Sequence, residues 1–134
     1  MTERTHAVVA IIQRHGTFLL VKRSDYNKTA SGYWCPVSGR IEMGETQEEA
    51  LKREVMEEVG LEVTATEKVA EINSADDRFV LHFWRTDIIS GEAHITSDEA
   101  TALQWFTLAE LKELQPTFKE DIEILGRVAT TAQR

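Results

Sequence analysis

The stretch from Thr46 to Gly60 constrains the fold of this chain more than any other, because it carries signals for both ends of a helix. Thr46 is followed three residues later by Glu49, which gives the capping box that satisfies backbone N–H groups at a helix N-terminus. Gly60 suits the left-handed conformation that ends a helix at little steric cost. We therefore expect a helix over about Gln47–Val59.

Two stripes of side chains follow this expected helix. One stripe is apolar and suits packing against a sheet. It consists of Leu51, Val55 and Val59. The other stripe is acidic, because Glu54, Glu57 and Glu58 stand at positions i, i+3 and i+4 and share one side of the helix. Three carboxylates beside a packed face repel one another, and a hard divalent cation such as Mg²⁺ explains them better than a solvated acidic surface.

The chain before the helix predicts strands and turns. Residues 6–12 and 17–22 are β-rich runs separated by Arg14, His15 and Gly16, which favours a β-hairpin. Residues 33–37 predict a short strand. Residues 38–45 include two glycines and predict a loop that leads into the helix.

The chain after the helix predicts further strands and then two helices. Strand-like stretches lie near residues 62–64, 69–73, 79–89 and 103–106. Capping boxes formed by Thr107 with Glu110 and by Thr117 with Glu120 open a short helix through Leu114 and a C-terminal helix through about residue 129. This order favours an α/β (α+β) fold, an α/β/α sandwich in which helices flank a mixed sheet.

Length and composition limit the classes of function. The chain has 134 residues, 42% hydrophobic and 28% charged, which fits one folded domain over residues 1–134. A formal net charge of −8 disfavours long DNA or RNA as a ligand, because such ligands need clustered Lys and Arg. The single cysteine, Cys35, is expected to be a packed thiol. The apolar run 7–12 is too short for a signal peptide or a membrane span, so we expect a cytoplasmic protein without a membrane partner.

Residues 39–61 resemble a complete Nudix box. The family pattern is a glycine, five residues, a glutamate, seven residues, Arg-Glu, an aliphatic residue, any residue, Glu-Glu, any residue, a glycine and an aliphatic residue. The fixed positions are filled here by Gly39, Glu45, Arg53, Glu54, Glu57, Glu58 and Gly60. The flanking strands and residues 103–111 also look like this family. The chain therefore resembles the MutT-like nucleoside diphosphate-X pyrophosphohydrolases.

The resemblance implies a divalent cation, Mg²⁺ or Mn²⁺, as cofactor. The implied ligands are Glu54, Glu57, Glu58 and the backbone carbonyl of Gly39. Glu45 would pair with Arg53 and fix the loop to the helix, so both would support the metal ligands without binding the ion themselves.

The charge of the substrate explains why such an enzyme needs cations. A pyrophosphate linkage is anionic and repels hydroxide, so a catalyst must neutralise phosphate oxygens and align a water with phosphorus. One carboxylate must also accept the proton of that water, and we favour Glu57 or Glu54 for this step. The candidate outside the box is Glu99, because related hydrolases often carry a metal-binding or basic carboxylate in that loop. A merely solvated Glu99 is the alternative.

The sequence contains fewer signals for substrate recognition than for metal binding. Lys22 and Arg23 end an expected strand where Nudix nucleoside triphosphate hydrolases carry phosphate-contacting residues, and an ordinary charged strand end is the alternative. We expect a small nucleotide as substrate, cleaved as a triphosphate to monophosphate and pyrophosphate. A nucleotide sugar or dinucleoside polyphosphate, RNA-end processing and a non-catalytic nucleotide-sensing module are the other readings. The complete set of box carboxylates disfavours a sensor, and the sequence leaves a homodimer open.

Overall fold

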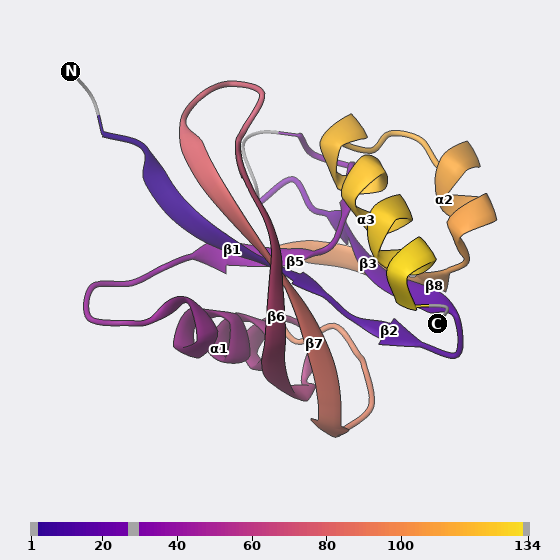
Figure 1. Ribbon diagram of the computed structural model, residues 1–134, viewed down its shortest axis with the longest axis horizontal. Helices are drawn as coiled ribbons and strands as arrows, with labels where there is room; N and C mark the ends of the chain where they lie inside the picture. Colours follow the sequence, from indigo (N-terminus) through magenta and orange to yellow (C-terminus); the bar gives the residue numbers. More distant parts are fainter. Residues whose placement is uncertain (1–2, 27–29, 133–134) are drawn as a thin grey trace.

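In the computed structural model, which describes residues 3–26 and 30–132, two β-sheets lie between helices (Figure 1). The first sheet has the order β5-β1-β7-β6 and consists of β1 (Thr5–Ile11), β5 (Val37–Arg40), β6 (Glu62–Asn73) and β7 (Phe79–Ser90). In the second sheet β3 (Thr17–Arg23) pairs with β2 (Gln13–Arg14), β4 (Trp34–Cys35) and β8 (Ala100–Phe106). The helices are α1 (Gln47–Val59), α2 (Leu108–Glu113) and α3 (Lys119–Ala132).

Alternation along β1 divides the core into two layers. Val8 and Ala10 pack with the apolar side chains of α1, whereas Val9 and Ile11 pack with side chains of α2 and α3 such as Leu125. Helix α1 therefore covers one side of the strands and α2 and α3 cover the other (Figure 1). Strand β1 runs parallel to β7 and antiparallel to β5, so the sheet is mixed. The expected α/β/α sandwich is confirmed.

Helix α1 begins and ends where its sequence signals predict. The Thr46 side chain accepts a hydrogen bond of 3.1 Å from the Glu49 backbone, and the Glu49 side chain accepts one of 2.8 Å from the Thr46 backbone. Gly60 has a φ of 70°, and its N–H donates to the carbonyl of Met56 at 3.1 Å. The ends of the helix are therefore fixed by local chemistry, and its position is fixed by the apolar stripe that it buries.

The predicted hairpin of residues 6–12 with 17–22 is wrong in its pairing. Strand β1 lies in the first sheet, and only the short β2 pairs with β3 across the turn at His15 and Gly16. The chain changes sheets at Ile12, whose carbonyl still accepts a hydrogen bond of 3.0 Å from Leu19. Both apolar runs are buried on two faces, and such runs show that a strand is buried without showing which strand it pairs with.

Other boundaries differ by a few residues. The predicted loop over residues 38–45 begins as strand, because β5 continues to Arg40 alongside β1. The two stretches near 62–64 and 69–73 form the single strand β6, whose register shifts interrupt the alternation between them. Helix α2 has the expected Thr107 capping box, but α3 begins at Lys119, so Phe118 and not Thr117 is the residue before its first turn. No helix in the described part of the chain is long and apolar enough to span a membrane.

Candidate metal centre and active site

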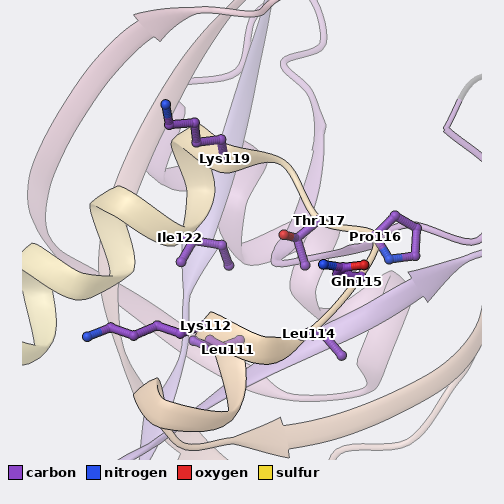
Figure 2. A pocket seen from close by; sticks show the side chains of 8 residues that line it. All are labelled: Leu111, Lys112, Leu114, Gln115, Pro116, Thr117, Lys119 and Ile122. Atoms are coloured by element: carbon purple, nitrogen blue, oxygen red, sulfur yellow. The ribbon is translucent and has the colours of Figure 1, made fainter.

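The surface of the described residues has two hollows of interest. An open hollow of about 460 Å³ lies between α2 and α3 (Figure 2). Its lining includes Leu111, Ile122, Lys112 and Lys119 but no carboxylate. The other is a cavity of about 760 Å³ lined by Glu54, Glu58 and Glu99. Because the hydrolysis expected from the sequence requires acidic ligands for cations, the second cavity is the candidate active site.

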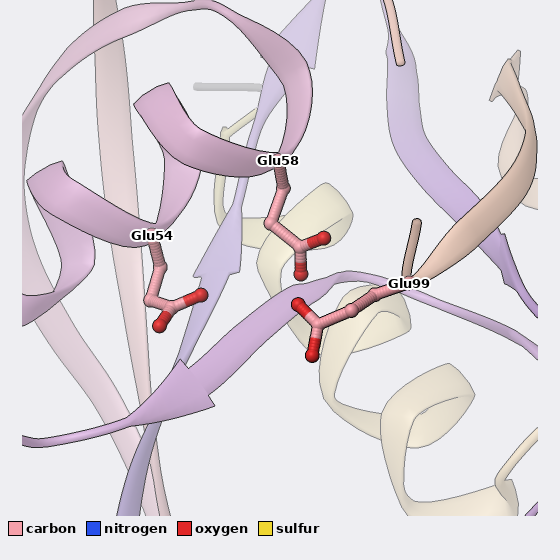
Figure 3. A group of neighbouring side chains, drawn as sticks. All are labelled: Glu54, Glu58 and Glu99. Carbon is pink, nitrogen blue, oxygen red and sulfur yellow. The ribbon is translucent and has the colours of Figure 1, made fainter. Parts of the chain in front are cut away.

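Three carboxylates from two elements converge in this cavity (Figure 3). Glu54 and Glu58 lie one turn apart on α1, and Glu99 immediately precedes β8. One oxygen from each lies within 4.8 Å of the others. Glu58 is buried, Glu54 is half-buried and Glu99 is exposed, so the group opens from the packed helix face toward solvent. Such a set of hard oxygen donors fits Mg²⁺ or Mn²⁺.

Ionisation of the clustered carboxyl groups is unfavourable in the absence of a cation. Burial, opposed by a hydrogen bond from Ser97 and reinforced by the negative charges of Glu99 and Glu54, raises the pKa of Glu58 to about 7. Burial also raises the pKa of Glu54, while Arg53 opposes that shift. A divalent cation among these oxygens would stabilise the ionised carboxylates and reverse both shifts. The electrostatics of the cluster therefore fit a cation-binding role.

Gly39 lies directly against this cluster. A methyl group added to Gly39 would overlap the carboxylate of Glu54. Strand β5 holds Gly39 opposite Val8 of β1, so the backbone has little room to retreat. The glycine therefore permits close approach of β5 to the acidic side chains, as the implied use of its backbone carbonyl as a ligand requires.

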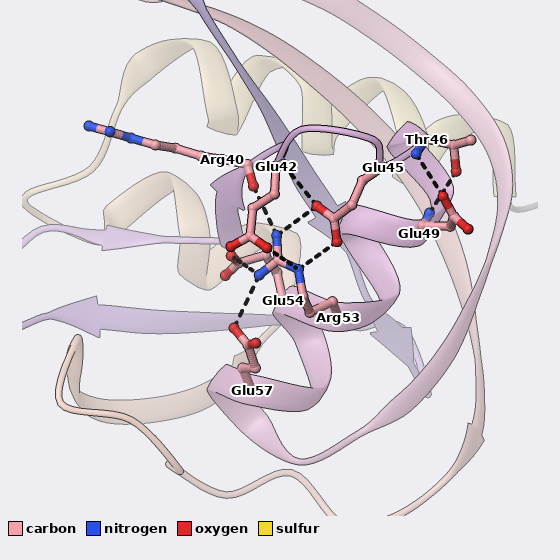
Figure 4. Close-up of polar contacts among 8 residues, drawn as sticks. All are labelled: Arg40, Glu42, Glu45, Thr46, Glu49, Arg53, Glu54 and Glu57. Atoms are coloured by element: carbon pink, nitrogen blue, oxygen red, sulfur yellow. Dashed lines mark hydrogen bonds and ion pairs between the residues drawn. The ribbon is translucent and has the colours of Figure 1, made fainter.

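Arg53 connects the loop before α1 with the acidic face of the helix (Figure 4). Its Nε and Nη2 donate to the two oxygens of Glu45 at 2.6 and 2.9 Å, and Nη2 also donates to the carbonyl of Arg40 at 3.0 Å. Its Nη1 donates to Glu54 at 2.8 Å and to Glu57 at 3.2 Å. The expected pair between Glu45 and Arg53 is present, and the hydrogen bonds from Arg53 lower the pKa of Glu45 to about 2.

The other residues named from the sequence have different surroundings. The Glu57 side chain is 58% exposed and ion-paired with Arg53, and it lies outside the group formed by the other three glutamates. Its roles as ligand and base remain predictions. Arg23 lines the cavity, whereas Lys22 is not among the described residues that line it. Cys35 is buried, and burial raises the pKa of its thiol to about 12, which suits the expected packed thiol.

Two further residues of the cavity wall were not among the site residues expected from the sequence. Phe79, at the start of β7, is in contact with the guanidinium groups of both Arg40 and Arg78, whose Cζ atoms are 5.7 and 5.6 Å from the ring centroid. Asp121 of α3 is buried in the wall, and burial together with the charge of Glu120 raises its pKa to about 7. No local motif marks these positions, because their proximity to the carboxylates depends on tertiary packing.

Comparison with known proteins identifies the family of this chain and agrees with its fold. The NUDIX domain matches residues 1–127, so the chain belongs to the Nudix family of pyrophosphohydrolases. Among curated relatives, CTP pyrophosphohydrolase of Escherichia coli K12 is 32% identical over 118 residues, which cover 88% of this chain and 86% of that protein. The oxidized purine nucleoside triphosphate hydrolase of Mus musculus is 29% identical over 82% of this chain and 70% of that protein.

Solved structures show the same fold. The MutT protein of Methanosarcina mazei Go1 superposes with a TM-score of 0.86 at 20% identity, and the match covers 100% of both chains. The solution structure of the E. coli ORF135 protein gives a TM-score of 0.74 at 32% identity, with 97% of this chain and 90% of that chain covered. Their architecture supports the sandwich described above.

Proposed function

We propose that this protein hydrolyses a nucleoside triphosphate to the monophosphate and pyrophosphate, using Mg²⁺ or Mn²⁺ held by the cavity carboxylates. The observation that carries the proposal is the convergence of Glu54, Glu58 and Glu99 in one cavity. The relatives named above that act on CTP and on oxidized purine nucleoside triphosphates support a triphosphate substrate. On the family pattern, Glu57 and the carbonyl of Gly39 complete the ligand set.

The reaction requires charge neutralisation, a phosphate-binding group and a proton acceptor. Bound divalent cations supply charge neutralisation of the phosphate oxygens and polarisation of the attacking water. Arg23, in the cavity wall, provides a fixed positive charge for a phosphate. Hydrolysis forms a bond from water oxygen to phosphorus and breaks the bridging P–O bond, and pyrophosphate leaves. A carboxylate, Glu54, Glu57 or Glu99, accepts the proton of that water.

The decisive experiment is a substrate panel scored by product identity. Nucleoside triphosphates, nucleotide sugars, dinucleoside polyphosphates and a capped RNA oligonucleotide are incubated with Mg²⁺ or Mn²⁺. We expect monophosphate and pyrophosphate from a triphosphate and no turnover after exhaustive chelation. Exclusive cleavage of another class would replace the substrate assignment, and binding without cleavage of any compound would favour the sensing module. Light scattering of the same sample measures whether the chain forms a homodimer.

A matched pair of variants tests the carboxylates. Glu58→Gln removes the negative charge of one carboxylate in the cluster. We expect turnover to fall at least about a hundredfold, the usual scale for losing a pre-placed electrostatic group. Glu48→Gln changes an exposed glutamate in the first turn of the same helix and should leave turnover unchanged. We expect Glu57→Gln to lower turnover as Glu58→Gln does. Near-normal turnover in folded Glu58→Gln would contradict the metal assignment.

A further inference from the structure

The segment that carries Glu99 is joined to the C-terminal end of α1. The last carbonyls of a helix have no partner within the helix and must find one elsewhere. The Thr96 side chain donates a hydrogen bond to the carbonyl of Glu57, and the Thr96 N–H donates to the carbonyl of Glu58 at 3.0 Å. The N–H of His94 donates to the carbonyl of Val59 at 3.0 Å. Residues 94–96 therefore cap α1 from outside the helix.

Ser97 extends this connection into the acidic cluster. Its hydroxyl donates to the Glu58 carboxylate at 2.8 Å and accepts a hydrogen bond of 3.2 Å from the backbone N–H of Glu99. One serine therefore contacts the side chain of one cluster glutamate and the backbone of another. The position of Glu99 is thus tied to the position of Glu58.

A second attachment lies on the other side of Glu99, at the end of β3. Ser24 is 7% exposed, and its N–H donates to the carbonyl of Glu99 at 3.0 Å. Its hydroxyl donates to the carbonyl of Asp98 at 2.5 Å and accepts a bond of 3.2 Å from the N–H of Tyr26. The backbone around Glu99 is consequently fixed from two elements, although residues 91–99 contain no regular strand or helix.

We infer that Thr96 and Ser24 are positioning residues for the metal centre. Their hydroxyl groups hold Glu99 beside Glu58 before any cation binds. Without them the like charges of the two carboxylates would separate, because the exposed Glu99 can move into solvent. Holding the charges together in advance lowers the reorganisation needed to bind a cation. This inference rests on the proposed function, because it assigns Glu99 to the same metal centre.

The test compares Mn²⁺ affinity and kinetics in single variants of the full chain. Thr96 is exposed, so Thr96→Val keeps the shape and removes only the hydroxyl. We expect Mn²⁺ binding to the substrate-free protein, measured by electron paramagnetic resonance, to weaken by about 10- to 100-fold, the range seen when residues that orient metal ligands are changed. We expect kcat to fall at limiting Mn²⁺ and KM at saturating Mn²⁺ to stay within about twofold. Ser24→Ala should act in the same direction.

Two controls separate positioning from general damage. Thr96→Ser restores the hydroxyl and should restore Mn²⁺ affinity, and Thr64→Val changes an exposed threonine on β6 and should have no effect. If Thr96 acts through Glu99, the double variant Thr96→Val/Glu99→Gln should bind Mn²⁺ no more weakly than Glu99→Gln alone.

Different measurements reject the positioning role of Thr96 and the assignment of a nucleoside triphosphate as substrate. Wild-type Mn²⁺ affinity in folded Thr96→Val would overturn the positioning role, and so would a double variant that loses affinity additively. A wild-type protein that binds Mn²⁺ but cleaves no nucleoside triphosphate would overturn the substrate assignment and leave the positioning role supported, because the Mn²⁺ measurement needs no substrate.

Discussion

The carboxylate of Glu54 lies so close to the backbone of Gly39 that no side chain fits between them. The two residues come from different elements, and each element is fixed separately. Strand β5 is paired to β1 opposite Val8, and α1 is anchored by buried side chains such as Leu51 and Val55. The close approach is therefore a property of the packed fold, and a larger residue at position 39 must displace either the strand or the carboxylate.

This relationship predicts the effect of Gly39→Ala. The added methyl group should push the Glu54 side chain away from the cluster, weaken Mn²⁺ binding by at least about tenfold and lower turnover at limiting metal. The measurements are Mn²⁺ titration and steady-state kinetics. Gly126→Ala is the matched control, because the nearest heavy atom to the added group is 4.0 Å away and the site lies in the interior of α3. Unchanged Mn²⁺ binding in Gly39→Ala would argue against a cluster that depends on this contact.

Arg53→Lys should damage the site while keeping the charge. A lysine ammonium cannot reproduce the two parallel bonds to Glu45 together with the bond to the carbonyl of Arg40. We expect Tm to fall by several degrees in thermal unfolding and Mn²⁺ affinity to fall, because the loop and Glu54 lose a shared anchor. A cycle with Glu45→Gln checks the mechanism: the double variant should lose less than the sum of the single losses. Strictly additive losses would show that the two residues act independently.

Asp121 should make the protein less stable as pH rises toward neutrality. Burial raises its pKa from 3.8 to about 7, so between those values the folded chain holds a proton that the unfolded chain has released. Because the unfolded state then binds fewer protons, the free energy of unfolding falls as pH rises through this window and levels off above about 7. Asp121→Asn should remove part of this slope and stabilise the protein at pH 8 by on the order of 2–4 kcal/mol.

The measurement for Asp121 is urea unfolding at several pH values with a chelator present, so that metal binding does not contribute. Glu58, whose pKa is also raised to about 7, retains its own share of the slope in the Asp121→Asn variant. A pH dependence identical in the two proteins would show that the buried Asp121 carboxyl does not titrate differently in the folded state.

The sequence predicts α1 and its immediate surroundings well, because the signals there are local. A capping box, a terminal glycine and the spacing of Glu54 and Glu58 depend only on residues within a few positions of one another. The pair of Glu45 with Arg53 follows from the family pattern, and the structure has it. Glu99 required the resemblance, because nothing in its own neighbourhood marks it as an active-site residue.

The parts that the sequence did not predict depend on tertiary packing. Strand β1 and strand β3 both appear as buried apolar runs, and their assignment to different sheets comes from pairing with β7 and β8, far along the chain. The exposed position of Glu57, outside the group formed by the other three glutamates, depends on how α1 is rotated against the sheet. Asp121 and Phe79 reach the cavity only after α3 and the β6–β7 turn have packed.

Arg4 is joined to the β6–β7 turn. Its guanidinium makes a bidentate pair with Asp77, with Nη2 at 2.8 and 2.9 Å from the two carboxylate oxygens. Asp77 has a φ of 64°, and the N–H of Thr5 donates to the carbonyl of Arg78 at 3.0 Å. Ser74, Asp76, Arg78 and Phe79 from the same turn line the cavity. The pair therefore holds a wall of the candidate substrate site.

Arg4→Ala should consequently raise KM for the nucleotide by about twofold to fivefold, since an exposed pair contributes up to about 1 kcal/mol. We expect kcat and Mn²⁺ affinity to stay within about twofold, because neither Arg4 nor Asp77 belongs to the acidic cluster. Lys52→Ala, which removes a 3.9 Å ion pair with Glu62 away from the cavity, is the matched control and should leave KM unchanged. The reversed pair Arg4→Asp/Asp77→Arg should recover part of the loss, because it restores the attraction between position 4, just before β1, and the turn. An unchanged KM in Arg4→Ala, or a fall in kcat equal to that in Glu58→Gln, would show that this pair does not act through the substrate wall.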